Sequence, residues 1–366
     1  MLATLSAICS ITLGSSLVEP PPTHDQVAGK PSLVATDAQL KSTLVVATLE
    51  HELVEGKSLL WCGTMPMAWQ ELVQAMGSPL TTDAQGPSGA MIGSLNATGT
   101  SKDDLDSDSY VAMAGFGKDD ILKKIREALQ QRFKGAASPK LLPDSLNSDE
   151  IFAYSYLFKN LEFAEPFLRR EIPLGFQRAS VAAFGLWPDH RADDQWGALA
   201  EQVSILSYTS PESWTVELKS KAAGDRLIIA RLDKKKTLAE TVVASLGAGK
   251  DQKPQSMNRE DRLVVPLLNF DITRTFGELA GVMLRGPKAS GLITGAIQNI
   301  RFRLDEKGAV LKSEASLRVT ASAVPRQVRE MVCDGPFLIV MMRANAKHPY
   351  FAAWVDNPEI LVGMKK

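Results

Sequence analysis

Apolar residues alternate with polar turns along the second half of the chain, and this pattern predicts most of its strands. Residues 151–158 form a continuous apolar and aromatic run, as expected of a strand covered on both faces. Further apolar runs of strand length occur at 214–218, 226–232, 336–342 and 350–355. The first two of these flank a turn at 222–225 and are expected to pair, and the spacing after Thr237 predicts a capped helix.

Helical spacing is the main signal in the first half of the chain. Asp37 is expected to cap a helix over 38–55 that ends at Gly56. A short apolar run at 58–62, a helix at 66–76 and an amphipathic helix at 118–133 follow, whereas 78–109 is rich in Gly, Ser, Thr and Asp and predicts a loop. Helices early and strands late indicate the α+β class.

Composition and charge exclude several classes of function. The 366 residues are 45% hydrophobic and 23% charged, which is ordinary globular composition. With 41 Lys and Arg against 42 Asp and Glu, the chain has no basic excess for neutralising phosphates, so nucleic-acid binding is not expected. The motifs GxSxG, GxxxxGK[ST], GxGxxG and CxxC do not occur, nor does a His pair at i, i+4. We therefore expect no metal, no cofactor and no enzyme activity.

The N-terminal residues leave two interpretations open. Residues 1–18 are mostly apolar, but Ser and Thr interrupt them and no Lys or Arg precedes Lys30. They are either a signal-like segment of an extracellular or periplasmic protein or a frayed terminus of a cytoplasmic one. In either case the stretch is too polar for a stable membrane span. Residues 19–36 predict a linker and 37–366 a single domain, in which Cys62 and Cys333 are expected to be buried free thiols.

Several segments, in this order along the chain, resemble the serpin family of serine protease inhibitors. They are 57–62 running into 65–77, 152–160 followed by Pro166-Phe167, Val264-Val265-Pro266 with 269–272, the turn 305–308, and Cys333-Asp334-Gly335-Pro336-Phe337-Leu338-Ile339 with Val355-Asp356-Asn357-Pro358. The resemblance runs from about residue 38 to 360 and implies a large mixed or antiparallel main sheet, a second sheet, and N-terminal helices packed on them. The stretch between 77 and 152 is short for the family, so this would be a divergent and shortened member.

The resemblance also implies a reactive loop and a partner, a serine-type protease. Its hinge would be Glu306, Lys307, Gly308 and Ala309, and the loop would extend over 309–329. Counting along the family pattern places the scissile bond between Ser322 and Ala323, with Arg326 and Arg329 as baits for a trypsin-like pocket if the count shifts. In the family, the cleaved loop enters the main sheet as a new strand.

The residues after the hinge are suited to such a strand. Ala309, Leu311, Ser313, Ala315, Leu317, Val319 and Ala321 form one almost wholly apolar face, whereas Val310, Lys312, Glu314, Ser316, Arg318 and Thr320 form a mostly polar one. One interpretation is a bait that inserts on cleavage. The alternative is a non-inhibitory scaffold or interaction protein in which 309–320 already pairs with 299–304 as a hairpin over 305–308.

Two observations favour the alternative. Leu311 and Leu317, if exposed in a loop, would each forfeit about 1.5–3 kcal/mol of burial free energy. In addition, inhibitory members of the family favour small residues after the hinge glycine, where Val310, Leu311 and Lys312 stand here.

A further pair of residues tests the resemblance. Tyr154 and Gln298 stand where the family places the polar shutter beneath its main sheet. Gln298 can both donate and accept a hydrogen bond, whereas Tyr154 is much larger than the asparagine of the family pattern. A shutter of this kind would control opening of the main sheet differently.

Overall fold

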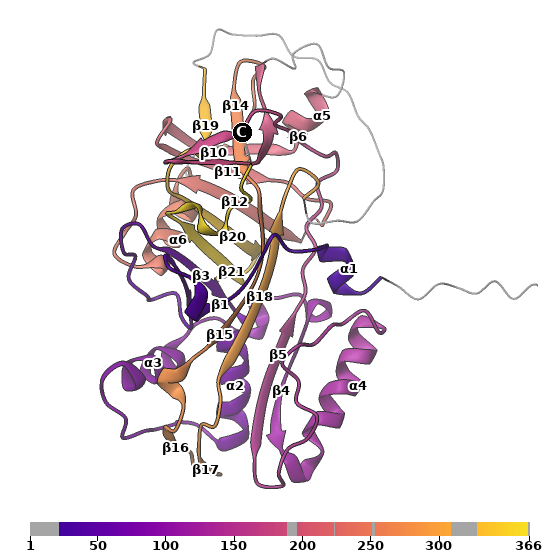
Figure 1. Ribbon diagram of the computed structural model, residues 1–366, viewed down its shortest axis with the longest axis vertical. Coiled ribbons are helices and arrows are strands. Elements are labelled where there is room, and N and C mark those ends of the chain that lie inside the picture. The colour runs from indigo at the N-terminus through magenta and orange to yellow at the C-terminus, as the bar shows by residue number, and fades with distance from the viewer. Residues whose placement is uncertain (1–21, 189–195, 223, 251–252, 309–327, 365–366) are drawn as a thin grey trace, which may run out of the picture.

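An eight-stranded sheet forms the largest element of the computed structural model, which describes residues 22–188, 196–222, 224–250, 253–308 and 328–364 (Figure 1). The strand order is β13-β10-β11-β12-β20-β21-β3-β2. Neighbours are antiparallel except β2 and β3, which run parallel. The strands are β2 (Thr43–Val46), β3 (Ser58–Cys62), β10 (Val203–Ser210), β11 (Ser213–Leu218), β12 (Asp225–Arg231), β13 (Gln255–Ser256), β20 (Phe337–Arg343) and β21 (Phe351–Val355).

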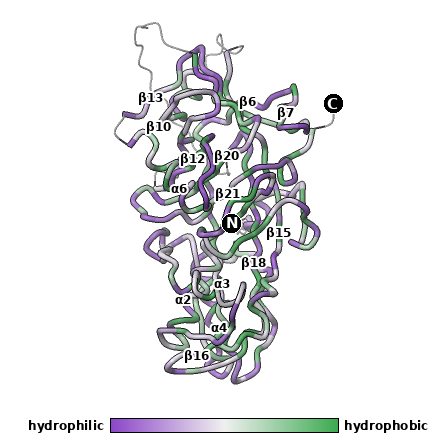
Figure 2. The backbone as a smooth tube through the Cα atoms, turned by 90° about the vertical axis from the view of Figure 1, so that its left-hand side faces the viewer, coloured by the Kyte–Doolittle hydropathy of each residue, from purple (hydrophilic) through white to green (hydrophobic). Residues whose placement is uncertain are grey.

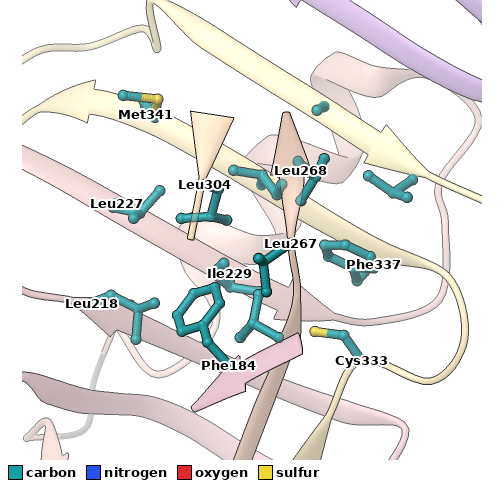
Figure 3. Close-up of a cluster of buried hydrophobic side chains, with 14 of the residues drawn as sticks. Phe184, Leu218, Leu227, Ile229, Leu267, Leu268, Leu304, Cys333, Phe337 and Met341 are labelled. Atoms are coloured by element: carbon teal, nitrogen blue, oxygen red, sulfur yellow. The ribbon is translucent and has the colours of Figure 1, made fainter. Parts of the chain in front are cut away.

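A four-stranded sheet of order β19-β14-β9-β6 packs near one end of the first. Its strands are β6 (Leu168–Arg169), β9 (Ala183–Leu186), β14 (Arg262–Pro266) and β19 (Glu330–Val332). Figure 3 shows the core they share: Phe184 of β9 lies with Leu218 and Ile229 of the larger sheet, and Cys333 lies near Phe337. All five side chains are fully buried, so apolar packing joins the two sheets.

The remaining long strands form two separate sheets, which we together call the divided sheet. One part pairs β4 (Tyr110–Phe116) with β5 (Ile151–Leu157), and the other has the order β1 (Leu33–Thr36), β15 (Leu268–Thr275), β18 (Ile297–Leu304). Among the described residues, β5 and β18 each pair with a named strand on one edge only. We call these parts the β4–β5 half and the β15–β18 half.

Two helices cover opposite faces of the β4–β5 half. Helix α2 (Thr64–Met76) packs on one face, where Met67 approaches Ser155. Helix α4 (Ile121–Phe133) packs on the other, where Tyr154 joins the cluster of Ile125 and Leu129. Because Tyr154 and Ser155 are consecutive on a strand, they necessarily point to opposite faces.

The smaller elements fill in around these layers. They are α1 (His24–Ala28), α3 (Gly86–Ala97), α5 (Trp196–Glu201), α6 (Leu238–Gly247), the hairpin of β7 (Leu174–Phe176) and β8 (Ala179–Val181), and the hairpin of β16 (Met283–Arg285) and β17 (Ser290–Leu292). Thr237 caps α6 by accepting a hydrogen bond from the Glu240 amide, as the spacing predicts. Figure 2 shows the molecule elongated, with β16 at one end and β13 and β10 at the other.

The α+β class is confirmed, as are the strands expected at 58–62, 151–158, 214–218, 226–232, 336–342 and 350–355 and the helices expected at 66–76 and 118–133. The helix over 38–55 is wrong, because Thr43–Val46 is a strand parallel to β3. Residues 78–109 contain α3 rather than loop alone, and 22–36, expected as linker, contain α1 and β1. Cys62 and Cys333 are buried free thiols.

Candidate functional site

The chain reverses direction at the end of β18 through a turn over 305–308, which we call the hinge turn. The Gly308 amide donates to the Asp305 carbonyl at 3.1 Å, and the Lys307 amide donates to the Asp305 carboxylate at 3.0 Å. Gly308 then forms antiparallel bridges with Asp305 on one side and with Glu162 on the other. Gly308 therefore stands between the end of β18 and the segment that follows β5.

Backbone contacts fix the hinge turn against that segment. The Phe163 amide donates to the Lys307 carbonyl at 3.3 Å, and the Phe167 amide donates to the Glu306 carbonyl at 2.7 Å. Gly308 has φ +79°, and a Cβ placed there would lie 2.6 Å from the Phe163 nitrogen. Both the left-handed backbone and the close approach therefore require glycine at this position.

Charged groups of the hinge turn are partly buried as well. The Glu306 side chain is 14% exposed and lies 3.6 Å from the Arg169 guanidinium. Burial raises the pKa of the Asp305 carboxyl, against the attraction of Arg303 and the bond from the Lys307 amide. The turn is thus held by polar as well as steric contacts.

The segment after β5 is in turn tied to the eight-stranded sheet. Lys159 forms a 2.8 Å ion pair with Asp225 of β12, and both side chains are at most 10% exposed. The Lys221 amide donates to the Glu162 carbonyl at 2.7 Å, and its ammonium lies 3.5 Å from the Glu162 carboxylate. The hinge turn therefore rests, through residues 159–163, on the largest sheet of the molecule.

Arg329 marks the other end of the expected loop, and it is buried rather than exposed. Its guanidinium lies 2.6 Å from the fully buried Asp261 carboxylate, and it also donates to the Gln255 side chain and to the Ser256 carbonyl. The Arg262 amide donates to the Arg329 carbonyl, next to the parallel pairing of β14 with β19. The expectation that Arg329 is an exposed bait is therefore corrected: its charge is neutralised inside the protein.

The other bait residues, Ser322, Ala323 and Arg326, lie outside the described residues, as do Ala309 and the expected second arm of the hairpin. The structure does describe the residues at the two ends of the expected loop. The hinge turn fixes residue 308 between the two halves of the divided sheet, and Arg329 fixes the return to the four-stranded sheet.

The two shutter-like residues lie in different surroundings. Gln298 is buried beside α2, where its side-chain amide donates to the Cys62 carbonyl at 3.1 Å and to the Thr64 hydroxyl at 2.8 Å. Tyr154 faces α4, where burial raises its pKa. Ser155, one position along the strand, is on the face of β5 that α2 covers. The alternation of a strand could have indicated this, because a shift of one residue exchanges the faces.

The described residues offer little for covalent or metal chemistry. Burial raises the pKa of both the Cys62 and the Cys333 thiols, which disfavours the reactive thiolate. No group of three or more His, Cys, Asp or Glu side chains in the described part of the chain is arranged to hold a metal ion. Among the same residues, no helix combines the length and the apolar character needed to cross a membrane.

No family model and no curated protein matches the sequence. Solved structures do show similarity in the arrangement of the chain. Serpin48 of the insect Tenebrio molitor matches at 12% identity and TM-score 0.41, over 80% of this chain and 95% of that one. Thyroxine-binding globulin in complex with thyroxine matches at 13% identity and TM-score 0.44, over 82% and 93%. A second structure, of the human thyroxine-binding globulin, matches at 12% identity and TM-score 0.44, over 82% and 92%.

Proposed function

We propose that the protein engages a serine-type protease through the segment 309–327. The observation that carries this proposal is the position of Gly308, bridged to Asp305 at the end of β18 and to Glu162 beyond the end of β5. A chain that leaves this residue toward the divided sheet meets the unpaired edges of both halves. A strand added there would gain backbone partners on each side.

The sequence of the segment supports the same function. Residues 309–321 alternate between an apolar and a mostly polar face, as does a strand with one buried face. Ser322 and Ala323 follow directly after this strand-like stretch, so cleavage there would free its C-terminal end. Arg329, held by Asp261, would remain with the four-stranded sheet.

A second function is favoured by a different observation. The hinge turn already brings Gly308 back antiparallel to Asp305, which is how a hairpin over 305–308 begins. If 309–320 pairs permanently with β18, the protein is a non-inhibitory scaffold or interaction protein. The two functions differ in whether the strand enters the sheet before or after cleavage.

Limited proteolysis followed by thermal melting separates them. The native protein is cut, the site is mapped by mass, and the melting temperatures of cut and intact protein are compared. Cleavage between 318 and 327 with a large rise in melting temperature supports the protease-engaging function, because insertion relaxes a metastable fold. Resistance of this segment, or cleavage without stabilisation, supports the scaffold.

A pair of variants locates the bait residue. With Ser322 as bait, Ser322→Arg is expected to shift formation of an SDS-resistant adduct from a protease with a small pocket to trypsin. Arg326→Ser is the matched control, because it removes the nearest alternative arginine and should leave the first adduct unchanged. If Arg326→Ser abolishes the adduct instead, Ser322 is not the bait.

A further inference from the structure

Helix α1 lies beside β18 and beyond the upper end of β5 (Figure 1). Thr23 and Gln26 form a reciprocal capping box, so this short helix has a defined beginning. The helix has only five residues, which is too short for a helix that is stable alone in water. Its position therefore depends on what it contacts.

On the β4–β5 side, His24 is held by aromatic rings. Its imidazole stacks on Phe158 with ring centroids 3.6 Å apart and meets the edge of Phe133 at 4.9 Å. Nδ1 lies 2.8 Å from the Tyr156 hydroxyl, and the His24 amide donates to the Ala136 carbonyl at 2.8 Å. His24 is only 8% exposed, so this attachment is a buried one.

On the β15–β18 side, one guanidinium holds both ends of the helix. Arg301 of β18 donates through Nη1 to the Asp25 carboxylate at 2.5 Å and through Nη2 to the Gly29 carbonyl. The Arg301 side chain is 16% exposed. Planar, forked donation of this kind fixes orientation as well as distance.

The pairing of β15 with β18 explains why a polar cover is needed here. The register sets Asn269 opposite Arg303 and Asp271 opposite Arg301, so these four side chains share one face. The other face carries Phe270, Ile272 and Ile300, all buried in the core. Residues that follow α1 continue across the polar face, where the Asn269 side chain donates to the Lys30 carbonyl.

A second contact crosses between the halves on this face. Lys140, in the segment between α4 and β5, forms an ion pair with Asp271 of β15. The α1 contacts join β5 and β18, which share no backbone ladder among the described residues, and the ion pair joins β15 to the segment before β5.

We propose that α1 is a latch that holds the two halves of the divided sheet together, and that its release lets them separate. The latch acts through two attachments. One is the contact of His24 with Phe133, Tyr156 and Phe158, which we call the His24 socket. The other is the pair of hydrogen bonds from Arg301 to Asp25 and Gly29, which we call the Arg301 fork. This proposal does not depend on protease engagement. It concerns only how far the β4–β5 and β15–β18 halves can move apart.

Hydrogen exchange followed by mass spectrometry tests the latch. Arg301→Gln, His24→Ala and deletion of residues 1–29 are each expected to raise exchange about fivefold to tenfold in peptides covering 151–158 and 297–304. Peptides covering 225–231 and 337–343, in the eight-stranded sheet, should exchange as in the intact protein. Deletion of residues 1–21 and Arg285→Gln, which breaks an ion pair in the distant β16–β17 hairpin, are the matched controls.

The double variant His24→Ala with Arg301→Gln gives the sharpest outcome. Releasing either attachment frees the same helix, so the double variant should exchange no faster than the faster single one. Additive acceleration would contradict the latch, since each residue would then act on its own strand. Unchanged exchange in 151–158 and 297–304, or equal acceleration in all four regions, would also overturn it.

Discussion

The eight-stranded sheet and the divided sheet are built from similar strands but held together differently. In the first, β20 and β21 have partners on both edges, and nearly all of their residues are buried. In the second, β5 has a partner on one edge among the described strands, and only Tyr154 of its seven residues is fully buried. Strands of similar apolar composition can thus be paired on both edges or keep one edge without a strand partner.

The two sheets are stabilised by different combinations of contacts. Apolar packing between layers holds the eight-stranded sheet, because its side chains lie against other side chains on both faces. Between the halves of the divided sheet, polar contacts add to the apolar packing: the Arg301 fork, the Lys140 and Asp271 pair, and the bridges of Gly308. Local stability should therefore be higher in the first region than in the second.

Truncation of a buried side chain in the eight-stranded sheet should lower the free energy of unfolding the most. Trp354 of β21 is 2% exposed, and Trp354→Ala should lower the free energy of unfolding by about 3–5 kcal/mol. Phe152→Ala, in the half-buried β5, should cost only about 1–2 kcal/mol. Urea denaturation followed by circular dichroism measures both. Equal losses would mean that the two regions do not differ in cohesion.

A smaller effect is expected at the hinge turn. Gly308→Ala adds a Cβ 2.6 Å from the Phe163 nitrogen at φ +79°, and should cost about 1–3 kcal/mol. Gly281→Ala is the matched control, because Gly281 has φ +75° and no atom within 4 Å of the added Cβ. The difference between the two variants in thermal melting isolates the close approach. If they lose the same stability, backbone strain alone accounts for Gly308.

Protonation of His24, in the His24 socket, should make the stability of the protein depend on pH. Burial lowers the pKa of His24 from 6.5 to about 4, against the attraction of Asp25. Above pH 6.5 neither state binds the proton; as the pH falls from 6.5 to 4, the unfolded chain binds it and the folded one does not, so stability falls. The groups facing the ring are Asp25, the Tyr156 hydroxyl, and the rings of Phe133 and Phe158.

His24→Gln should remove this part of the pH dependence. The comparison is the melting temperature of wild type minus that of the variant, measured from pH 7 to pH 4. Burial and Arg274 also lower the pKa of His51, so only the difference between the two proteins isolates His24. A constant difference across this range would contradict the shift.

The smallest effect is expected at the surface. Arg285 and Asp83 form a 2.6 Å ion pair with both side chains well exposed, 49% and 83%. Arg285→Gln should change the unfolding free energy by less than about 1 kcal/mol, because water and salt screen such pairs. Urea denaturation at low and high salt checks this. A larger loss would show that polar cross-ties at the surface stabilise as strongly as those between the sheet halves.

Local patterns predicted the strands of the eight-stranded sheet, because each is a run of apolar residues between turns. They failed at 38–55, where Leu40 and Leu44 have helical spacing but the run Thr43–Val46 pairs with β3. They also missed α3, in which only Ile92 and Leu95 are buried, so that its apolar pattern is weak. In both cases contacts with distant residues override the local preference.

The candidate site was predictable in part. The turn at 305–308 follows from its residues, whereas the partner of Gly308 at Glu162 and the partner of Arg329 at Asp261 are far away in the chain. Burial of Arg329 follows from a carboxylate that no local spacing reveals. The role of α1 was equally hidden, because His24 and Arg301 are joined only by the fold.

The order of the eight strands bears on synthesis of the chain. Strand β21, which ends at Val355, lies between β20 and β3, so the pair β2 and β3 has no strand ladder to the rest of the sheet until β21 has been synthesised. Loss of β21 alone would leave the edges of β3 and β20 exposed together. Assembly of this sheet therefore waits for a strand that lies far along the chain, and a chain that has β2 and β3 but not yet β21 would be prone to aggregation.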